Sequence, residues 1–372
     1  MKMTHSTKNT SPSHLKKDAR PILKDILHIM LPLGVSVGLI IWMFHRLDFH
    51  RIGDVLSHDC DFFWIGMMMF ITMLSHIIRG IRWGIQLRAA GVPRMPVVAE
   101  SVSIFSAYAL NLVVPYMGEA FRCIYVARRE KVKLSTVVGT DLGDRGSDAV
   151  VVVCLLGVAL IVAHPALMKF FDQYPLGKSL ENIFSHWELW IGILAAFGLF
   201  ILADRRWKNK KFFSGINQTV SRMWQGFKVL FFMKGRLAYV FLTIGIWTCY
   251  FLETYCCFFA FPFTRELIHI PGSAYGLIPG LVVFVFGSFS MAVPSNGGLG
   301  PWNIAVMYAL MLYGVSHTDA AAYSIVAWGF QAIMLVALGI FSAFYITITN
   351  RRLNRTPTHA LKQQNSATPD AR

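Results

Sequence analysis

The densest group of ionisable residues in this sequence is the stretch GTDLGDRGSD, residues 139–148. If the stretch is helical, Asp141, Asp144 and Asp148 lie at positions i, i+3 and i+7 and share one face, with Arg145 beside them. Such a cluster can bind a lipid headgroup or relay protons, with Asp144, Arg145 and Asp148 as the candidates. The same pattern also fits a solvated, charged helix end at the cytoplasmic interface of a membrane.

Two arginines and one glutamate lie next to or within other apolar runs. Arg79 and Arg82 share a helix face in HIIRGIRWG, where they can bind a lipid phosphate or extend toward the membrane interface. Glu253 lies inside an apolar run, where an ionised carboxylate costs about 2.5–3.5 kcal/mol. We therefore expect Glu253 to face the protein interior and to pair with Arg79 or Arg82, either as a structural group or in a functional role.

A run rich in Pro, Gly and Asn, MAVPSNGGLGPW at 291–302, interrupts a long apolar region. Each unpaired peptide group in the hydrocarbon costs several kcal/mol, so we expect this backbone to line a polar cavity. Its glycines would leave peptide N–H groups open to a ligand, and a helix beginning near Pro301 or Trp302 would direct its positive end at an anion such as a phosphate. The candidate substrate-binding residues here are Pro294, Asn296, Gly297, Gly298 and Gly300.

A shorter counterpart, NLVVPYMGEAFR at 111–122, lies earlier in the chain and repeats the pattern of Val-Pro followed by Gly. Glu119 and Arg122 share a helix face there, which allows an ion pair between them. The candidate substrate-binding residues of this stretch are Asn111, Pro115, Gly118, Glu119 and Arg122.

These residues are set in a chain of 372 residues that is 55% hydrophobic and only 15% charged, whereas soluble proteins carry about 25% charged residues. The sequence predicts an all-α, multi-pass membrane protein with about six full spans and two broken or re-entrant hairpins, about eight membrane segments in all. The full spans are expected at 26–44, 61–78, 146–163, 187–203, 237–262 and 320–347.

The Lys and Arg residues indicate how the segments are threaded, because cytoplasmic loops carry the excess of positive charge. Segment 97–118 has basic flanks, such as the expected loop 79–96, and this predicts a hairpin that enters from the cytoplasm and returns. The flanks of segment 274–315 are poor in Lys and Arg, which predicts a hairpin from the outside or two full spans. Hairpins from opposite sides are typical of an inverted repeat with a substrate site near the midplane.

The same pattern divides the chain into three parts and predicts cytoplasmic N- and C-termini in the cytoplasmic (inner) membrane of the cell. A basic N-terminal tail covers 1–25, a transmembrane domain covers 26–347, and a polar C-terminal tail, expected to be disordered, covers 348–372. The net charge of +15 fits loops that contact an anionic lipid surface better than it fits a nucleic-acid partner.

The sequence predicts no metal, no cofactor and no catalytic residue. His76 and Gln331 lie in expected spans and are interpreted as internal polar groups with hydrogen-bond partners. The cysteines lack metal-ligand spacing and mostly lie in apolar runs, which is typical of small buried hydrophobic residues. They are Cys60, Cys123, Cys154, Cys249, Cys256 and Cys257.

Four motifs, in this order, resemble the lysylphosphatidylglycerol synthase transmembrane family, also called flippase-like integral membrane proteins: RGIRW, NLVVPYMGEAFR, DRGSD and AVPSNGGLGPWNIA. The resemblance extends over nearly all of residues 20–347. Asn296 stands where the family usually has proline, and Asn303 stands near a position where an acidic residue is common. The resemblance implies movement of a phospholipid between leaflets. The best-known relatives also carry an aminoacyltransferase domain, which is not expected here, so a separate lipid-modifying enzyme is a candidate partner.

The sequence therefore favours a translocase (flippase) of a phospholipid or a lipid-linked glycan. Arg79, Arg82 and Arg122 would hold the headgroup. The acidic residues that would balance charge or relay protons are Glu119, Asp144, Asp148 and Glu253. One alternative is a membrane-embedded glycosyltransferase that uses acidic residues of the first external loop, and another is a non-transporting partner of a lipid-modifying complex. The acidic residues of that loop are Asp48, Asp54, Asp59 and Asp61.

Overall fold

The computed structural model describes residues 49–173 and 233–366, which form helices joined by short connections. The N-terminal tail and the spans expected at 26–44 and 187–203 lie outside the described residues. Four described helices are long and apolar enough to cross a membrane, and they confirm the other expected spans. They are α3 (Phe62–Ala89), α6 (Leu134–Val162), α11 (Arg236–Phe258) and the His317–Thr349 part of α15 (His317–Ser366).

Two of these helices extend into regions that were expected to be loops. α3 runs on to Ala89, so Arg79 and Arg82 lie inside a helix and are buried, not in the expected loop 79–96. α6 begins at Leu134, so the cluster around Asp144 lies within the helix rather than before it. The reason is that opposite charges on α3 and α6 face each other, and neither set has to reach water.

The C-terminal helix also exceeds its expected length. α15 continues to Ser366, although the tail from 348 onward was expected to be disordered. Once a helix is nucleated, each added residue contributes one backbone hydrogen bond, so polar residues can extend an existing span.

The first expected hairpin consists of α4 (Val97–Val113) and α5 (Met117–Arg129), with a break in which Tyr116 has a positive φ of 62°. The Asn111 side chain closes this break, because its Oδ1 accepts a hydrogen bond of 2.8 Å from the Gly118 peptide N–H. Gly118 also lets the two arms approach closely: a Cβ atom there would lie 1.9 Å from the carbonyl oxygen of Ala107.

The second hairpin consists of α13 (Leu277–Ser290) and α14 (Pro301–Met311), joined by a non-helical loop. Gly297, Gly298 and Gly300 in this loop all have positive φ values, of 58°, 85° and 93°, a conformation that glycine adopts without steric cost. The buried Asn303 caps α14, because its Oδ1 accepts from the Gly300 N–H at 3.1 Å and its Nδ2 donates to the Ser324 carbonyl of α15 at 2.9 Å.

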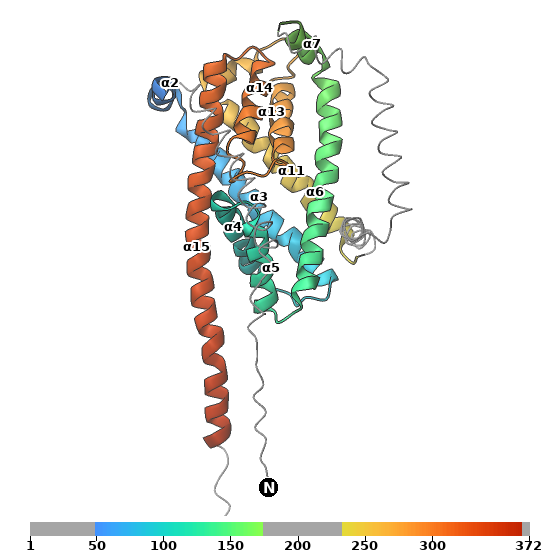
Figure 1. Cartoon of the computed structure of the whole chain (residues 1–372), viewed down its shortest axis with the longest axis vertical. Helices are drawn as coiled ribbons and strands as arrows, with labels where there is room; N and C mark the ends of the chain where they lie inside the picture. Colours follow the sequence, from blue (N-terminus) through green and yellow to red (C-terminus); the bar gives the residue numbers. More distant parts are fainter. Residues whose placement is uncertain (1–48, 174–232, 367–372) are drawn as a thin grey trace, which may run out of the picture.

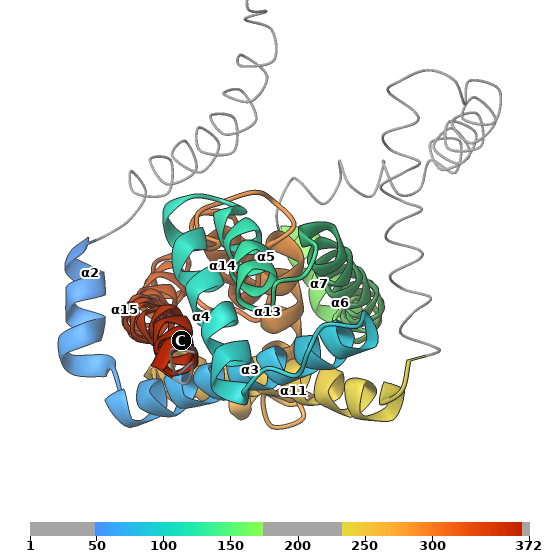
Figure 2. The ribbon, with the colours of Figure 1, turned by 90° about the horizontal axis from the view of Figure 1, so that it is seen from below.

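The helices pack in a reciprocal pattern. α3, the first hairpin and α6 form one half, and α11, the second hairpin and α15 form the other, with α3 packed along α11. α15 packs against α4, and in the same way α6 packs against α13. In Figure 1 the second hairpin lies above the first, and in both Figure 1 and Figure 2 the hairpins lie between α15 and α6. Each hairpin therefore contacts the last long helix of the other half.

The two breaks contact each other. Asn296 Nδ2, from the second break, donates to the Val113 carbonyl at the end of α4, at 3.4 Å. The Trp328 indole N–H of α15 donates to the Gly297 carbonyl at 2.9 Å. The segment 274–315 is therefore a pair of short helices whose connecting loop ends beside the first hairpin.

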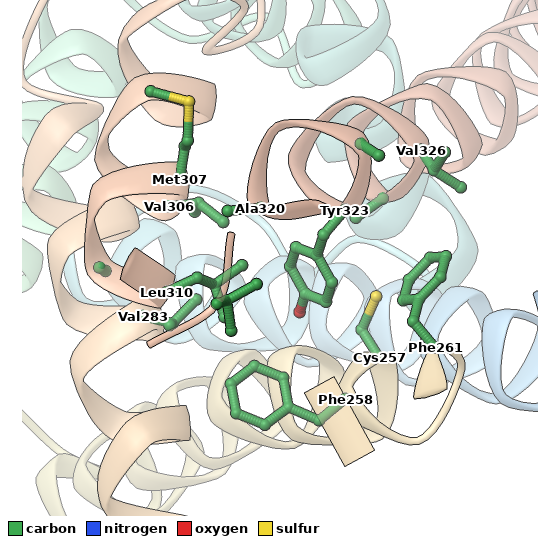
Figure 3. Close-up of a cluster of buried hydrophobic side chains, with 14 of the residues drawn as sticks. Cys257, Phe258, Phe261, Val283, Val306, Met307, Leu310, Ala320, Tyr323 and Val326 are labelled. Carbon is green, nitrogen blue, oxygen red and sulfur yellow. The ribbon is translucent and has the colours of Figure 1, made fainter. Parts of the chain in front are cut away.

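Apolar clusters stabilise each half. Figure 3 shows Phe258 and Phe261 from the end of α11 and its following turn packed near Tyr323 of α15. A second cluster around Trp83 and Val126 joins α3 to α5. None of the cysteines in the described residues forms a disulfide; four are buried, whereas Cys60 is half-buried and Cys154 is exposed, so for Cys154 the expected burial was wrong.

The remaining described elements are short and flank the long helices. They are α2 (Phe49–Asp54), the π-helix η1 (Val55–Asp59), α7 (His164–Gln173), α12 (Pro262–Arg265) and the 3₁₀ helix η2 (Glu266–Ile268).

Substitution of Gly118 should test the close approach within the first hairpin. Gly118→Ala places a methyl group against the Ala107 backbone, where no flexible side chain can move aside. We expect a loss of about 1–3 kcal/mol, typical of overpacking, seen as a lower midpoint of thermal unfolding in detergent. Gly139→Ala is the control, because a Cβ atom at Gly139 in α6 meets nothing within 4 Å. Equal midpoints for the two variants would contradict this packing.

Candidate functional site

A cavity of about 310 Å³ lies where the two hairpin breaks meet. Pro115 and Tyr116 from the first break line it, together with Pro294, Gly297 and Gly298 from the second. The expectation that the non-helical backbone lines a cavity is therefore confirmed for both breaks. The volume lies at the lower end of the range for small-molecule sites, about 300–1,000 Å³.

The lining combines charged, polar and aromatic side chains from both halves. The charged and polar residues are His76, Arg79, Asn111, Glu119, Arg145, Asp148, Glu253, Thr254, Ser288, Ser295 and Gln331. The aromatic residues are Tyr108, Tyr116, Trp247, Tyr250, Phe284, Trp302 and Trp328. The other lining residues are Leu112, Pro115, Val152, Val283, Met291, Val293, Pro294, Gly297, Gly298, Ala332 and Leu335.

Arg79 lies at the boundary between this cavity and a buried group of charges. Its guanidinium forms an ion pair with Asp148 and donates a hydrogen bond of 2.7 Å to the Tyr250 hydroxyl of α11. Asp148 also accepts from Arg82 at 2.8 Å. One carboxylate of α6 is thus shared by two arginines of α3, one facing the cavity and one behind it.

Behind the cavity, Asp144 is fully buried among three guanidinium groups. Arg82 lies 2.7 Å from it, whereas Arg122 and Arg79 lie at 3.8 and 3.9 Å. Arg122 pairs with Asp141 and also lies over the Trp83 ring, 4.5 Å from the ring centre. The interpretation of Asp144 as a solvated helix end is therefore wrong. Arg82, Arg122 and Asp144 do not line the cavity; they join α3, α5 and α6 in a buried network.

A second ion pair lies at the cavity itself, between Glu119 of α5 and Arg145 of α6. Asn111 Nδ2 donates to the same carboxylate at 3.1 Å. The expected pair of Glu119 with Arg122 does not form. Although these residues share a helix face, α6 offers each of them a partner of opposite charge, Arg145 to Glu119 and Asp141 to Arg122.

Glu253 was expected to face the protein interior; it lines the cavity, and its partner differs from the expected one. The Thr72 hydroxyl of α3 donates to its Oε2 at 2.7 Å. The expected pairing with Arg79 or Arg82 is wrong, because Asp144 and Asp148 already hold both guanidinium groups.

His76 differs from the expectation of a satisfied internal polar group. It is buried and stacked on Tyr108, with ring centres 4.4 Å apart. Neither of its ring nitrogens has a hydrogen-bond partner in the described part of the chain. Gln331, interpreted in the same way, lies at the cavity wall.

The peptide groups at the breaks are less open than expected. The N–H groups of Gly118 and Gly300 donate to Asn111 and Asn303, so neither is free for an anion. Asn296 binds the first break and, like Gly118 and Gly300, does not line the cavity. Trp302, in the first turn of α14, does line it, so the N-terminus of this helix borders the cavity as expected.

Sequence reasoning missed the aromatic wall. Its clearest signal was the helical spacing of Trp247, Tyr250 and Glu253, which places two rings on the same side of α11 as the carboxylate of that helix. Within the described residues, no group of three or more His, Cys, Asp or Glu side chains is placed to hold a metal ion.

Comparison with known proteins agrees with the motifs. A family model described as the lysylphosphatidylglycerol synthase TM region matches residues 29–339. No curated protein and no solved structure matches the chain.

Removal of the central carboxylate should destabilise the buried network. Asp144→Asn leaves Arg82 without full compensation, and breaking a buried pair in this way costs about 3–5 kcal/mol. The measurement is the free energy of unfolding of the purified protein in detergent. Asp61→Asn is the matched control: Asp61 lies 3.6 Å from Arg265 with both side chains nearly half exposed, and such pairs contribute up to about 1 kcal/mol. A similar loss in both variants would argue against the network.

Proposed function

The chain belongs to the lysylphosphatidylglycerol synthase TM region family, and from this premise we propose that it is a translocase. Its substrate is a phospholipid or a lipid-linked glycan, which it moves between the leaflets of the cytoplasmic membrane. The observation that carries the proposal is the cavity of about 310 Å³ between the two broken hairpins. A polar cavity at the junction of two related halves is where transporters with inverted repeats bind their cargo.

The ion pairs at the cavity contain charged side chains that can exchange their partner for the headgroup of a lipid. Arg79 and Arg145 line the cavity and are held by Asp148 and Glu119. A headgroup that enters can replace one partner of a pair while the other stays desolvated and charged. Glu253 supplies a third carboxylate, whose hydrogen bond comes from the neutral Thr72, and it can balance a charge or take up a proton.

The buried residues Arg82, Arg122 and Asp144 have a positioning role in this proposal. They fix α3, α5 and α6 so that Arg79, Asp148 and Glu119 face the cavity. Asn111 and Gly118 do the same for the first break, and Asn296, Asn303 and Gly300 do so for the second. Pro115, Pro294, Gly297 and Gly298 form the cavity wall at the breaks.

The glycosyltransferase alternative gains no support from Asp61, one of the acidic residues of the first expected external loop. Asp61 caps α3, because its Oδ1 accepts from the Phe63 N–H at 3.1 Å, and it also lies near Arg265. It does not line the cavity. A non-transporting partner would leave the charged cavity without a use.

Leaflet exchange in liposomes tests the proposal. The purified protein should accelerate exchange of short-chain fluorescent lipids relative to empty liposomes. Glu119→Gln should slow that exchange about tenfold, equivalent to about 1.4 kcal/mol in the barrier, because it removes a charge at the cavity. The measurement is the rate at which an impermeant reductant bleaches fluorophores arriving in the outer leaflet.

Glu130→Gln is the control variant, because it makes the same chemical change at the end of α5, where Glu130 pairs with Arg129 at 3.1 Å. It should exchange lipids at the wild-type rate. If wild-type protein and empty liposomes exchange all probes equally, translocation by this chain is excluded. If Glu119→Gln matches wild type, Glu119 has no part in the mechanism.

A further inference from the structure

Several polar atoms at the cavity have no partner within the described residues. Both ring nitrogens of His76, the Nε1 of Trp247 and the Oε2 of Glu119 are buried and make no hydrogen bond there. All three residues line the cavity. Buried polar groups are almost always hydrogen-bonded in folded proteins. A rotation of these side chains toward the cavity would let a bound molecule supply the missing partners.

Both arginines that line the cavity are already compensated by carboxylates, and the remaining lining carboxylate, Glu253, accepts a hydrogen bond from the Thr72 hydroxyl. Arg79 and Arg145 are the two lining guanidinium groups, and each is paired with a carboxylate, Asp148 and Glu119 respectively. An anionic headgroup would have to break one of these pairs. A cationic headgroup would approach the same two arginines and could donate hydrogen bonds but accept none, so the Trp247 N–H would stay unpaired.

The rest of the wall is aromatic. Rings from α4, α11, α14 and α15 line the cavity, among them Tyr108, Tyr250, Trp302 and Trp328. Flat ring faces carry partial negative charge and suit the polarised C–H groups on the face of a pyranose. The bound molecule therefore needs apolar faces, and groups at its edge that both donate and accept hydrogen bonds.

We propose that this cavity binds the neutral sugar headgroup of a glycolipid or lipid-linked glycan. This inference rests on the proposed translocase function and selects between its two substrate classes. A sugar hydroxyl accepts from the Trp247 N–H, donates to the Glu119 Oε2, and pairs with His76 in either direction. It does so without adding charge to a cavity whose arginines are already paired, and the cavity volume of about 310 Å³ suits a small headgroup.

Two variants remove the unpaired atoms while keeping the rings. Trp247→Phe removes the indole N–H but retains an aromatic ring beside Tyr250 and Phe284. His76→Phe removes both ring nitrogens but keeps a ring to stack on Tyr108. Trp64→Phe is the matched control, because Trp64 stacks on Phe259 at 4.7 Å and does not line the cavity.

The full chain is reconstituted in liposomes with three probes that share one labelled acyl chain. Their headgroups are a single neutral hexose, phosphoglycerol and a trimethylammonium group. We expect the hexose probe to exchange at least tenfold faster than the other two. Trp247→Phe and His76→Phe should each slow the hexose probe about tenfold, and Trp64→Phe should leave its rate unchanged.

The outcomes separate this inference from the translocase proposal. If the charged probes exchange as fast as the hexose probe, or if the two cavity variants keep the wild-type hexose rate, the sugar assignment is overturned while translocation stands. If no probe moves, translocation fails, and binding in phosphatidylcholine nanodiscs decides the sugar assignment. A thermal stabilisation by hexosyl lipid but not by phosphatidylglycerol, lost in Trp247→Phe, supports it; equal or absent stabilisation overturns it.

Discussion

A peptide group that leaves a helix inside a membrane needs a hydrogen-bond partner, and the architecture of this protein follows from that constraint. Three asparagines provide the partners. Asn111 accepts a hydrogen bond from the Gly118 N–H, and Asn303 accepts one from the Gly300 N–H. Asn296 donates to the Val113 carbonyl and so joins the two breaks. Because these side chains supply hydrogen-bond partners to the peptide groups at the breaks, the backbone can leave the helix within the membrane. The space between the breaks then stays available as a cavity. Asn303 is itself buried at the start of α14.

The second organising feature is the separation of charges into a buried set and a cavity set. Three aspartates on one face of α6 meet three arginines from α3 and α5, so the charges balance. A network of this kind adds little net stability over an apolar core, but it is expensive to break, and it therefore fixes which helices are neighbours. Arg79 and Asp148 belong to both sets, since they join the network and line the cavity. The orientation of the charged side chains at the cavity thus depends on residues that do not line it, such as Arg82, Arg122 and Asp144.

The sequence predicted the elements better than it predicted their contacts. The lengths of the apolar runs predicted the four described spans. The free-energy cost of unpaired peptide groups in the membrane predicted that both breaks line a cavity. Helical periodicity predicted that the three aspartates share one face of α6. It could not predict which helix they contact, because that contact joins residues far apart in sequence: Arg79 and Asp148 are 69 positions apart. For the same reason Glu253 and Glu119 were assigned the wrong partners. The unpaired nitrogens of His76 depend on what α4 places beside them, which no local pattern records. Arg82 and Arg122 look like headgroup ligands in the sequence, and only their position behind the cavity separates them from Arg79, which lines it.

The exchanged packing of the outer helices has a mechanical consequence. α15 follows the second hairpin yet packs on the first arm of the other one, and α6 has the reciprocal arrangement. Each hairpin thus packs against the last helix of the opposite half. A tilt of one half relative to the other would therefore move both hairpins together, because no hairpin packs against its own half alone.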